Sequence, residues 1–178
     1  MRIITGTLKG RNIHDSHGHR THPMSEKVRG ALFNALGDIE GLTFLDAYGG
    51  SGALALEAVS RGAKNAVAVE IDKNAYGAIS QNIQDMKVNS QVKAVRANIS
   101  GWSIHNMEKK FDVILLDPPY DQVRPDILQK LMNRHIKKGG LAVLSYLGRE
   151  KAPKFEGMTI IANKKYGDAQ LVFYRKPA

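Results

Sequence analysis

The feature that most constrains the fold is a repeated alternation of apolar strands with amphipathic helices. Four strand-like runs rich in Val, Leu, Ile and Ala lie at 42–47, 66–70, 92–96 and 111–117. Helical periodicity follows the first two of these runs, at 53–61 and 74–86. Parallel neighbouring strands need a crossover connection, which is usually a helix. The alternation therefore predicts an α/β domain with a mostly parallel sheet.

The C-terminal third continues the pattern with one helix and three strands. Pro125 can begin a helix that the run 137–140 ends, and three strands are expected at 141–146, 158–162 and 170–175. The segment 164–168 between the last two strands contains Gly and Asp, which suit a hairpin. We therefore expect seven strands in a Rossmann-like sheet, with the last strand antiparallel to its neighbour.

The N-terminal part differs from the rest and divides the chain into two regions. Residues 1–23 are predicted to form a basic extension, with a short β-like start at 2–5 and a polar loop after it. Residues 24–178 form the main domain. Its first helix is expected to begin after the cap Ser25 and to end at Gly37, with one apolar face made by Val28, Ala31, Leu32, Ala35 and Leu36.

The charge balance favours a polyanionic partner. The chain has 26 Lys and Arg against 17 Asp and Glu, a formal net charge of +9, and part of the surplus lies in the first thirty residues. Nucleic acid is the first candidate, and the residues expected to contact it are Arg2, Lys9, Arg11, Arg20, His22, Lys27 and Arg29. The histidines between 14 and 22 lie in an expected loop without thiolate neighbours, so we expect phosphate contact or a solvated loop and no metal site.

Composition also excludes several classes of protein. The chain has no cysteine, which excludes disulfides and cysteine-ligated metal centres and fits a reducing compartment. Its start lacks the apolar core of a secretory signal, and no apolar run is long enough to cross a membrane. We therefore expect a cytoplasmic protein without a membrane partner.

A glycine-rich loop at 46–52 joins the first strand to the next helix. Glycines let the backbone turn sharply and approach a ligand at the helix N-terminus, and Glu70 ends the following strand, where a carboxylate can bind ribose hydroxyls. A NAD enzyme would use both features. However, Asp46 would repel a pyrophosphate and attract the amino-acid end of S-adenosylmethionine, which favours the methyl donor. The candidate cofactor residues here are Asp46, Tyr48, Gly49, Gly50, Ser51, Gly52 and Glu70.

The tetrapeptide 117–120, Asp-Pro-Pro-Tyr, directly follows the fourth strand. Two prolines stiffen the backbone and remove two N–H donors, which leaves carbonyl acceptors beside the Asp117 carboxylate. Two acceptors can hold the N–H bonds of an aromatic amino group, and Tyr120 offers a face on which an unstacked base can lie. Asp117, Pro118, Pro119 and Tyr120 are therefore the expected catalytic residues, and the chemistry requires no metal.

Taken together, these blocks resemble the 16S ribosomal RNA guanine-N2 methyltransferases, within the class I methyltransferases. The likeness covers nearly the whole chain, at 2–4, 6, 10–11, 27–34, 46–58, 60–63, 117–120 and 166–168. It implies S-adenosylmethionine over Asp46, the loop glycines, Glu70 and Ile71, with its adenine near Asn98. It also implies a target guanine beside the tetrapeptide. We expect the partner to be ribosomal RNA, free or in an assembled small-subunit particle, and the enzyme to be a monomer.

Three other functions compete with this interpretation. A NAD-dependent oxidoreductase would use the glycine loop and Glu70, but it has no use for the tetrapeptide. A non-catalytic RNA-binding protein would need neither motif. An adenine-N6 methyltransferase acting on nucleic acid is the strongest alternative, because the tetrapeptide can hold either amino group.

Overall fold

The computed structural model describes residues 1–16 and 24–178. In these residues, seven strands form one sheet in the order β3-β2-β1-β4-β5-β7-β6. Their bounds are β1 (Thr43–Asp46), β2 (Asn65–Glu70), β3 (Val92–Arg96), β4 (Phe111–Leu116), β5 (Ile136–Leu147), β6 (Thr159–Tyr166) and β7 (Ala169–Arg175). β7 is antiparallel to both β5 and β6, while β1 to β5 pair in parallel. The predicted mostly parallel sheet with an antiparallel last strand is confirmed.

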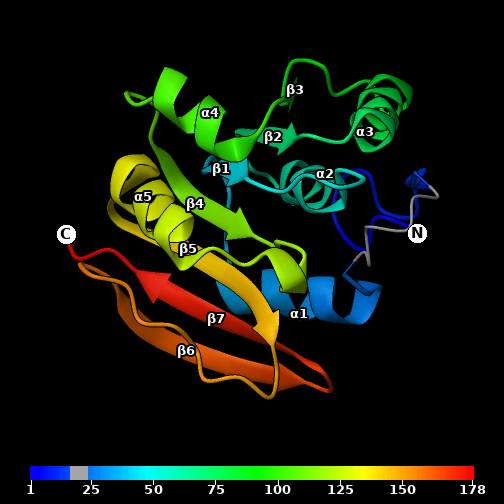
Figure 1. Cartoon of the computed structure of the whole chain (residues 1–178). Coiled ribbons are helices and arrows are strands. Elements are labelled where there is room, and N and C mark those ends of the chain that lie inside the picture. Colours follow the sequence, from blue (N-terminus) through cyan, green and yellow to red (C-terminus); the bar gives the residue numbers. More distant parts are fainter. Residues whose placement is uncertain (17–23) are drawn as a thin grey trace.

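The helices cover the two faces of this sheet (Figure 1). They are α1 (Glu26–Leu36), α2 (Ala53–Ser60), α3 (Lys73–Asp85), α4 (Ile99–His105) and α5 (Pro125–His135), with a 3-10 helix η1 (Tyr120–Gln122). α1, α2 and α3 share one apolar core with Phe44 and Val113, whereas α4 and α5 share a second core with Leu45 and Ile114. Successive strand residues point to opposite faces, so each strand supplies side chains to both cores.

Most element ends follow the expected capping residues. Ser25 caps α1 by accepting a hydrogen bond from the Val28 amide, and Gly37 ends that helix with a φ of 74°. α4 was not predicted from the sequence; it begins after Asn98, whose side chain accepts hydrogen bonds from the amides of Ser100 and Gly101. A seven-residue helix containing Gly101 has too short a pattern for periodicity to reveal.

The expected start of the fifth strand is wrong. Residues 137–140 do not end the helix as a loop; they belong to β5, which begins at Ile136 and pairs with β4 across a register shift. A Cβ on Gly140 would lie 2.8 Å from the Asp112 carbonyl oxygen, so the glycine permits this close approach. The last hairpin is tighter than expected, because β6 continues to Tyr166 and only Gly167 and Asp168 form the turn.

The N-terminal residues pack onto the domain. Ile3 and Ile13 are buried in the core beneath α1 to α3, and Arg2 and Asn12 form an antiparallel bridge. The amides of Ile4 and Thr5 donate to the Glu57 carboxylate of α2 over 2.9 and 3.1 Å. The boundary expected after residue 23 lies outside the described residues, so the two-region division stays a prediction.

The same Glu57 overturns one expected RNA contact. Arg29 is fully buried and donates through Nε to Glu57 at 3.2 Å, while Arg61 pairs with the other carboxylate oxygen at 2.9 Å. A second Arg29 nitrogen donates to the Arg2 carbonyl. Arg29 therefore ties α1 to α2 and to the N-terminal segment, and it is unavailable to a partner.

Candidate active site

The site lies where β1 and β4 run side by side. Asp46 at the end of β1 is in register with Leu115, so Asp117 lies two residues beyond it at the same edge. From β1 the chain continues into α2 on one face of the sheet, and from β4 it continues through η1 into α5 on the other face (Figure 1). Open α/β sheets bind ligands at such a switch in direction. The glycine loop and the tetrapeptide thus lie at the same edge of the sheet.

The glycines of the loop are required by backbone shape and by packing. Gly50 and Gly52 have φ angles of 58° and 84°, which other residues rarely adopt. A Cβ on Gly49 would lie 3.0 Å from the Ile79 side chain, so the loop packs closely on α3. Ser51 is also buried, and its carbonyl accepts a hydrogen bond from Asn82 of that helix. The loop is therefore held in place from behind.

Asp46 is a buried acid at the end of β1. Its carboxyl is fully buried and neither oxygen has a hydrogen-bond partner. Burial, followed by the nearby charges of Asp117 and Glu70, raises its pKa to about 8. The amides of Tyr48 and Ala55 face the carboxyl and lower this pKa without forming a hydrogen bond of normal geometry. An incoming ammonium group would supply the missing donors, so the residue fits the amino-acid end of S-adenosylmethionine.

Glu70 and Ile71 form the next part of the cofactor surface. Glu70 accepts hydrogen bonds from the amides of Gly50 and Asp72, over 2.9 and 2.8 Å, through different oxygens. A carboxylate oxygen has two lone pairs, so each retains one for a ribose hydroxyl. Ile71 is 61% exposed, which leaves an apolar side chain for a flat ring to cover.

Two other predicted cofactor residues have more limited roles than expected. The Asn98 side-chain oxygen is used to cap α4, so only its amide group is left to donate to a ligand. Tyr48 is half-buried against the core beneath α4 and α5, and burial raises its pKa to about 12. Its ring can line a pocket, but its hydroxyl stays protonated at neutral pH.

The acceptors of the tetrapeptide differ in their surroundings. Burial raises the pKa of Asp117 to about 6, and the Ser145 hydroxyl on β5 partly opposes this shift. The Pro119 carbonyl accepts a hydrogen bond from the Gln122 amide at 2.9 Å, which closes η1. Both prolines were expected to offer carbonyls to the site; Pro118 is the one whose carbonyl has no donor among the described residues.

Ser145 is the site residue that sequence reasoning missed. It is 4% exposed, and its Oγ lies 3.3 Å from the Tyr120 hydroxyl. Tyr120 is itself 39% exposed, so its ring is anchored at the hydroxyl while the rest remains accessible. Ser145 lies within an apolar strand with no motif around it, and only the pairing of β5 with β4 brings it to the tetrapeptide.

The expected RNA contacts are distributed unevenly. Arg2, Lys9, Arg11 and Lys27 are exposed, and Arg11 also donates to the Asp85 carbonyl at 2.9 Å. The N-terminal segment lies toward the edge to which the β4 arrow points (Figure 1). Two further residues of that set, at positions 20 and 22, lie outside the described residues. In the described ranges no helix is long and apolar enough to span a bilayer.

Comparisons with known proteins agree with this geometry. Ribosomal RNA small subunit methyltransferase D of Buchnera aphidicola is 32% identical over 84% of this chain and 78% of its own. YlbH of Bacillus subtilis, a candidate rRNA methyltransferase, is 29% identical over 99% of both chains. The solved structure of yhhF from Escherichia coli, a candidate methyltransferase, has a TM-score of 0.89 at 25% identity, covering 100% of this chain and 98% of its own. An RNA methyltransferase of Salinibacter ruber with bound S-adenosylhomocysteine shares the fold, with a TM-score of 0.65 at 17% identity, covering 87% of this chain and 94% of its own.

These likenesses decide between the two cofactors considered from the sequence. The relatives are methyltransferases, and the unpaired Asp46 carboxyl suits a cationic donor better than a pyrophosphate. The chain is therefore an S-adenosylmethionine-dependent methyltransferase with a class I fold, and not a NAD enzyme. The family described as Conserved hypothetical protein 95 matches residues 1–175, and the chain belongs to it.

Proposed function

We propose that this enzyme methylates the exocyclic N2 amino group of a guanine in small-subunit ribosomal RNA. The observation that carries the proposal is the half-buried Asp117 carboxyl, followed directly by the Pro118 carbonyl, at the same sheet edge as Asp46. The relatives named ribosomal RNA small subunit methyltransferase D support the choice of RNA. The residues that match the guanine-N2 family support the choice of atom.

An aromatic amino group is a poor nucleophile because its lone pair is delocalised into the ring. Asp117 and the Pro118 carbonyl can each accept a hydrogen bond from one N–H of this group. These two hydrogen bonds would turn the nitrogen lone pair toward the methyl donor. When bound, S-adenosylmethionine supplies the electrophilic methyl group. As the new N–C bond forms, Asp117 stabilises the positive charge on nitrogen and accepts the proton that the nitrogen then loses.

Tyr120 is proposed to hold the target base by stacking. Ser145 fixes the Tyr120 hydroxyl, which restricts the ring without covering its face. Stacking on an aromatic side chain contributes about 1 to 3 kcal/mol per base in single-strand binding proteins. The ring would thus retain a base whose amino group already contacts Asp117.

The exposed basic residues of the N-terminal segment complete the proposal. Arg2, Lys9, Arg11 and Lys27 would contact phosphates of the RNA around the target, with Arg20 and His22 as further contacts. We also propose that the enzyme is a cytoplasmic monomer. Whether it acts on free RNA or on an assembled particle can be decided by comparing methylation of the two substrates.

The test is mass spectrometry of 16S ribosomal RNA from cells that lack the gene, complemented with variants. We expect one N2-methylguanosine to disappear and to return with the wild-type gene but not with Asp117→Ala. Asp121→Ala is the matched control, because it removes an exposed carboxylate of η1, just after the tetrapeptide. Loss of an N6-methyladenosine would establish the adenine alternative instead. Unchanged RNA in the deletion strain would refute the proposal.

A further inference from the structure

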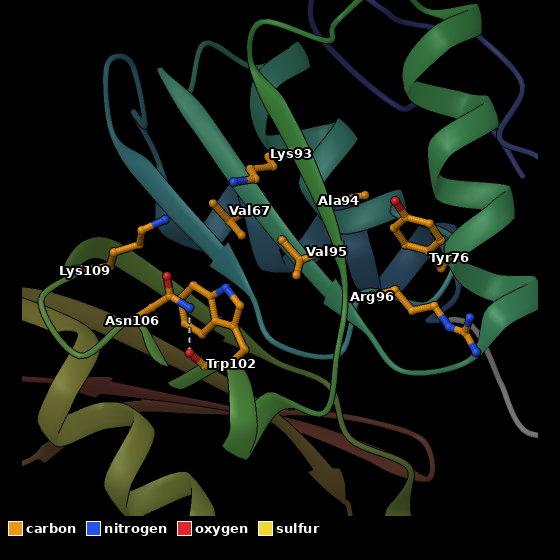
Figure 2. Close-up of a pocket in the computed structure, with 9 residues that line it drawn as sticks. All are labelled: Val67, Tyr76, Lys93, Ala94, Val95, Arg96, Trp102, Asn106 and Lys109. Atoms are coloured by element: carbon orange, nitrogen blue, oxygen red, sulfur yellow. Dashed lines mark hydrogen bonds between the residues drawn. The ribbon is translucent and has the colours of Figure 1, made fainter. Parts of the chain in front are cut away.

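A hollow of about 450 Å³ lies at the outer edge of the sheet, away from the tetrapeptide. It opens beside β3, which is the edge strand, between α3 and α4 (Figure 2). Three inter-strand spacings separate β3 from β4, which corresponds to roughly 14 Å across the sheet. No residue of the glycine loop or of the tetrapeptide lines it.

The charged residues that line the hollow are all basic. Lys93 and Arg96 belong to β3, and Lys109 belongs to the connection between α4 and β4. Figure 2 shows the ammonium groups of Lys93 and Lys109 approaching Val67 from opposite sides. None of the ion pairs in the described part of the chain includes these three cations. Their charge is therefore available to an anion.

The floor of the hollow is apolar and partly aromatic. Val67 and Val95 lie on one face of β2 and β3, because Lys93 is in register with Val67 and Val95 follows two residues later. The Trp102 ring closes the hollow from α4 and is held by packing against His135 and Phe111. Basic groups around an apolar floor suit a sugar-phosphate segment, since the phosphate meets the cations and the sugar or base meets the floor.

We propose that this hollow is a second RNA-binding site that holds the phosphate backbone of nucleotides flanking the target. The proposal rests on the RNA methyltransferase function proposed above and extends it. The net charge of +9 favours a polyanion over other anions. The hollow and the tetrapeptide are offset by roughly 14 Å across the sheet, so an RNA segment longer than this offset would contact both, and the site would orient the substrate without touching the reacting atoms.

The experiment compares two double variants with equal loss of charge. Lys93→Ala with Lys109→Ala removes the two converging ammonium groups, while Lys151→Ala with Lys154→Ala removes two exposed lysines from the β5–β6 connection. Binding of protein-free 16S RNA is measured between 50 and 200 mM salt, a range in which phosphate contacts weaken strongly. Each lost phosphate contact should reduce the salt slope by about 1.

We expect the hollow variant to bind RNA roughly tenfold more weakly than the control variant, with a salt slope smaller by about 2. Its KM for RNA should rise while kcat and S-adenosylhomocysteine affinity stay unchanged, and Lys93→Arg with Lys109→Arg should restore binding. Equal RNA affinity and salt slope in the two alanine variants would overturn the inference. The inference would also be overturned if the hollow variant bound RNA as well as the control variant but lost binding to an acidic peptide. A wild-type enzyme that methylates neither the protein-free RNA nor an assembled small-subunit particle would instead overturn the proposed function.

Discussion

Replacing Asp46 with asparagine tests whether the buried carboxyl destabilises the ligand-free enzyme. Its pKa is 3.8 when unfolded and about 8 when folded, because burial and the charges of Asp117 and Glu70 favour the neutral form. Between these values the folded state binds the proton and the unfolded state does not, so stability falls as pH rises. Within this window the free energy of unfolding falls by about 1.4 kcal/mol for each pH unit. From pH 5 to pH 8 the wild-type loss from this group is therefore at most about 4 kcal/mol.

Urea unfolding of the ligand-free protein at pH 5 and pH 8 measures the effect. The free energy of unfolding of Asp46→Asn, relative to that of wild type, should be a few kcal/mol larger at pH 8 than at pH 5, because the asparagine amide does not titrate. Asp112→Asn is the matched control. Burial raises the Asp112 pKa, but hydrogen bonds from Thr43 and the charge of Lys137 outweigh it and lower the pKa overall. The stability that Asp112 contributes is lost only as pH falls below about 4, so its variant should differ from wild type equally at both pH values.

An Asp46→Asn protein with the same stability difference from wild type at pH 5 and pH 8 would refute the reasoning. The reasoning would also be refuted if the stability difference between Asp112→Asn and wild type changed with pH in the same way. The effect would then not come from the buried Asp46 carboxyl. The asparagine variant should also bind S-adenosylmethionine more weakly, since it cannot balance the charge of the ammonium group. Increased stability together with lost affinity is the combination expected of a functional carboxylate.

Three further changes separate structural roles from catalytic ones. Glu57→Ala leaves two arginines without their counterion and should cost about 3 to 5 kcal/mol in urea unfolding, whereas Arg61→Ala, at the more exposed end of the network, should cost less. Asp117→Ala should lower the single-turnover methylation rate roughly 100-fold or more without weakening S-adenosylhomocysteine binding, and Asp117→Asn should do less damage; an undiminished rate in the alanine variant would contradict the mechanism. Tyr120→Phe and Ser145→Ala break the same contact, so the double variant should raise KM for RNA no more than either single variant; additive effects would contradict the anchoring role.

The parts of the fold that were predictable are those that depend on local sequence. The strands at 66–70 and 92–96 are apolar and short, and each is followed or preceded by a recognisable turn or helix, so their positions agree with the structure within a residue. Asp46 and the tetrapeptide were also found, because both directly follow apolar strands. Parallel strands end at a common edge, and the motifs therefore meet there.

The parts that were missed depend on tertiary contacts. Arg29 belongs to a basic N-terminal stretch and was expected to contact RNA, but its guanidinium is buried against Glu57, which is 28 residues away in the chain. Ser145 becomes part of the site only because β5 pairs with β4. The difference between the two proline carbonyls was also not predicted, because it comes from the Gln122 amide, three residues later, which donates a hydrogen bond to the Pro119 carbonyl. None of these pairings leaves a periodic signal in the sequence.

The Asp46 carboxyl also links cofactor binding to proton release. At pH 7 a group with a pKa of about 8 is mainly protonated in the ligand-free enzyme. An ammonium group beside it would favour the charged form and lower its pKa. Binding of S-adenosylhomocysteine at pH 7 should therefore release close to one proton, which calorimetry in buffers of different ionisation enthalpy measures directly. The release should vanish in Asp46→Asn, and proton release that persists in this variant would place the titrating group elsewhere.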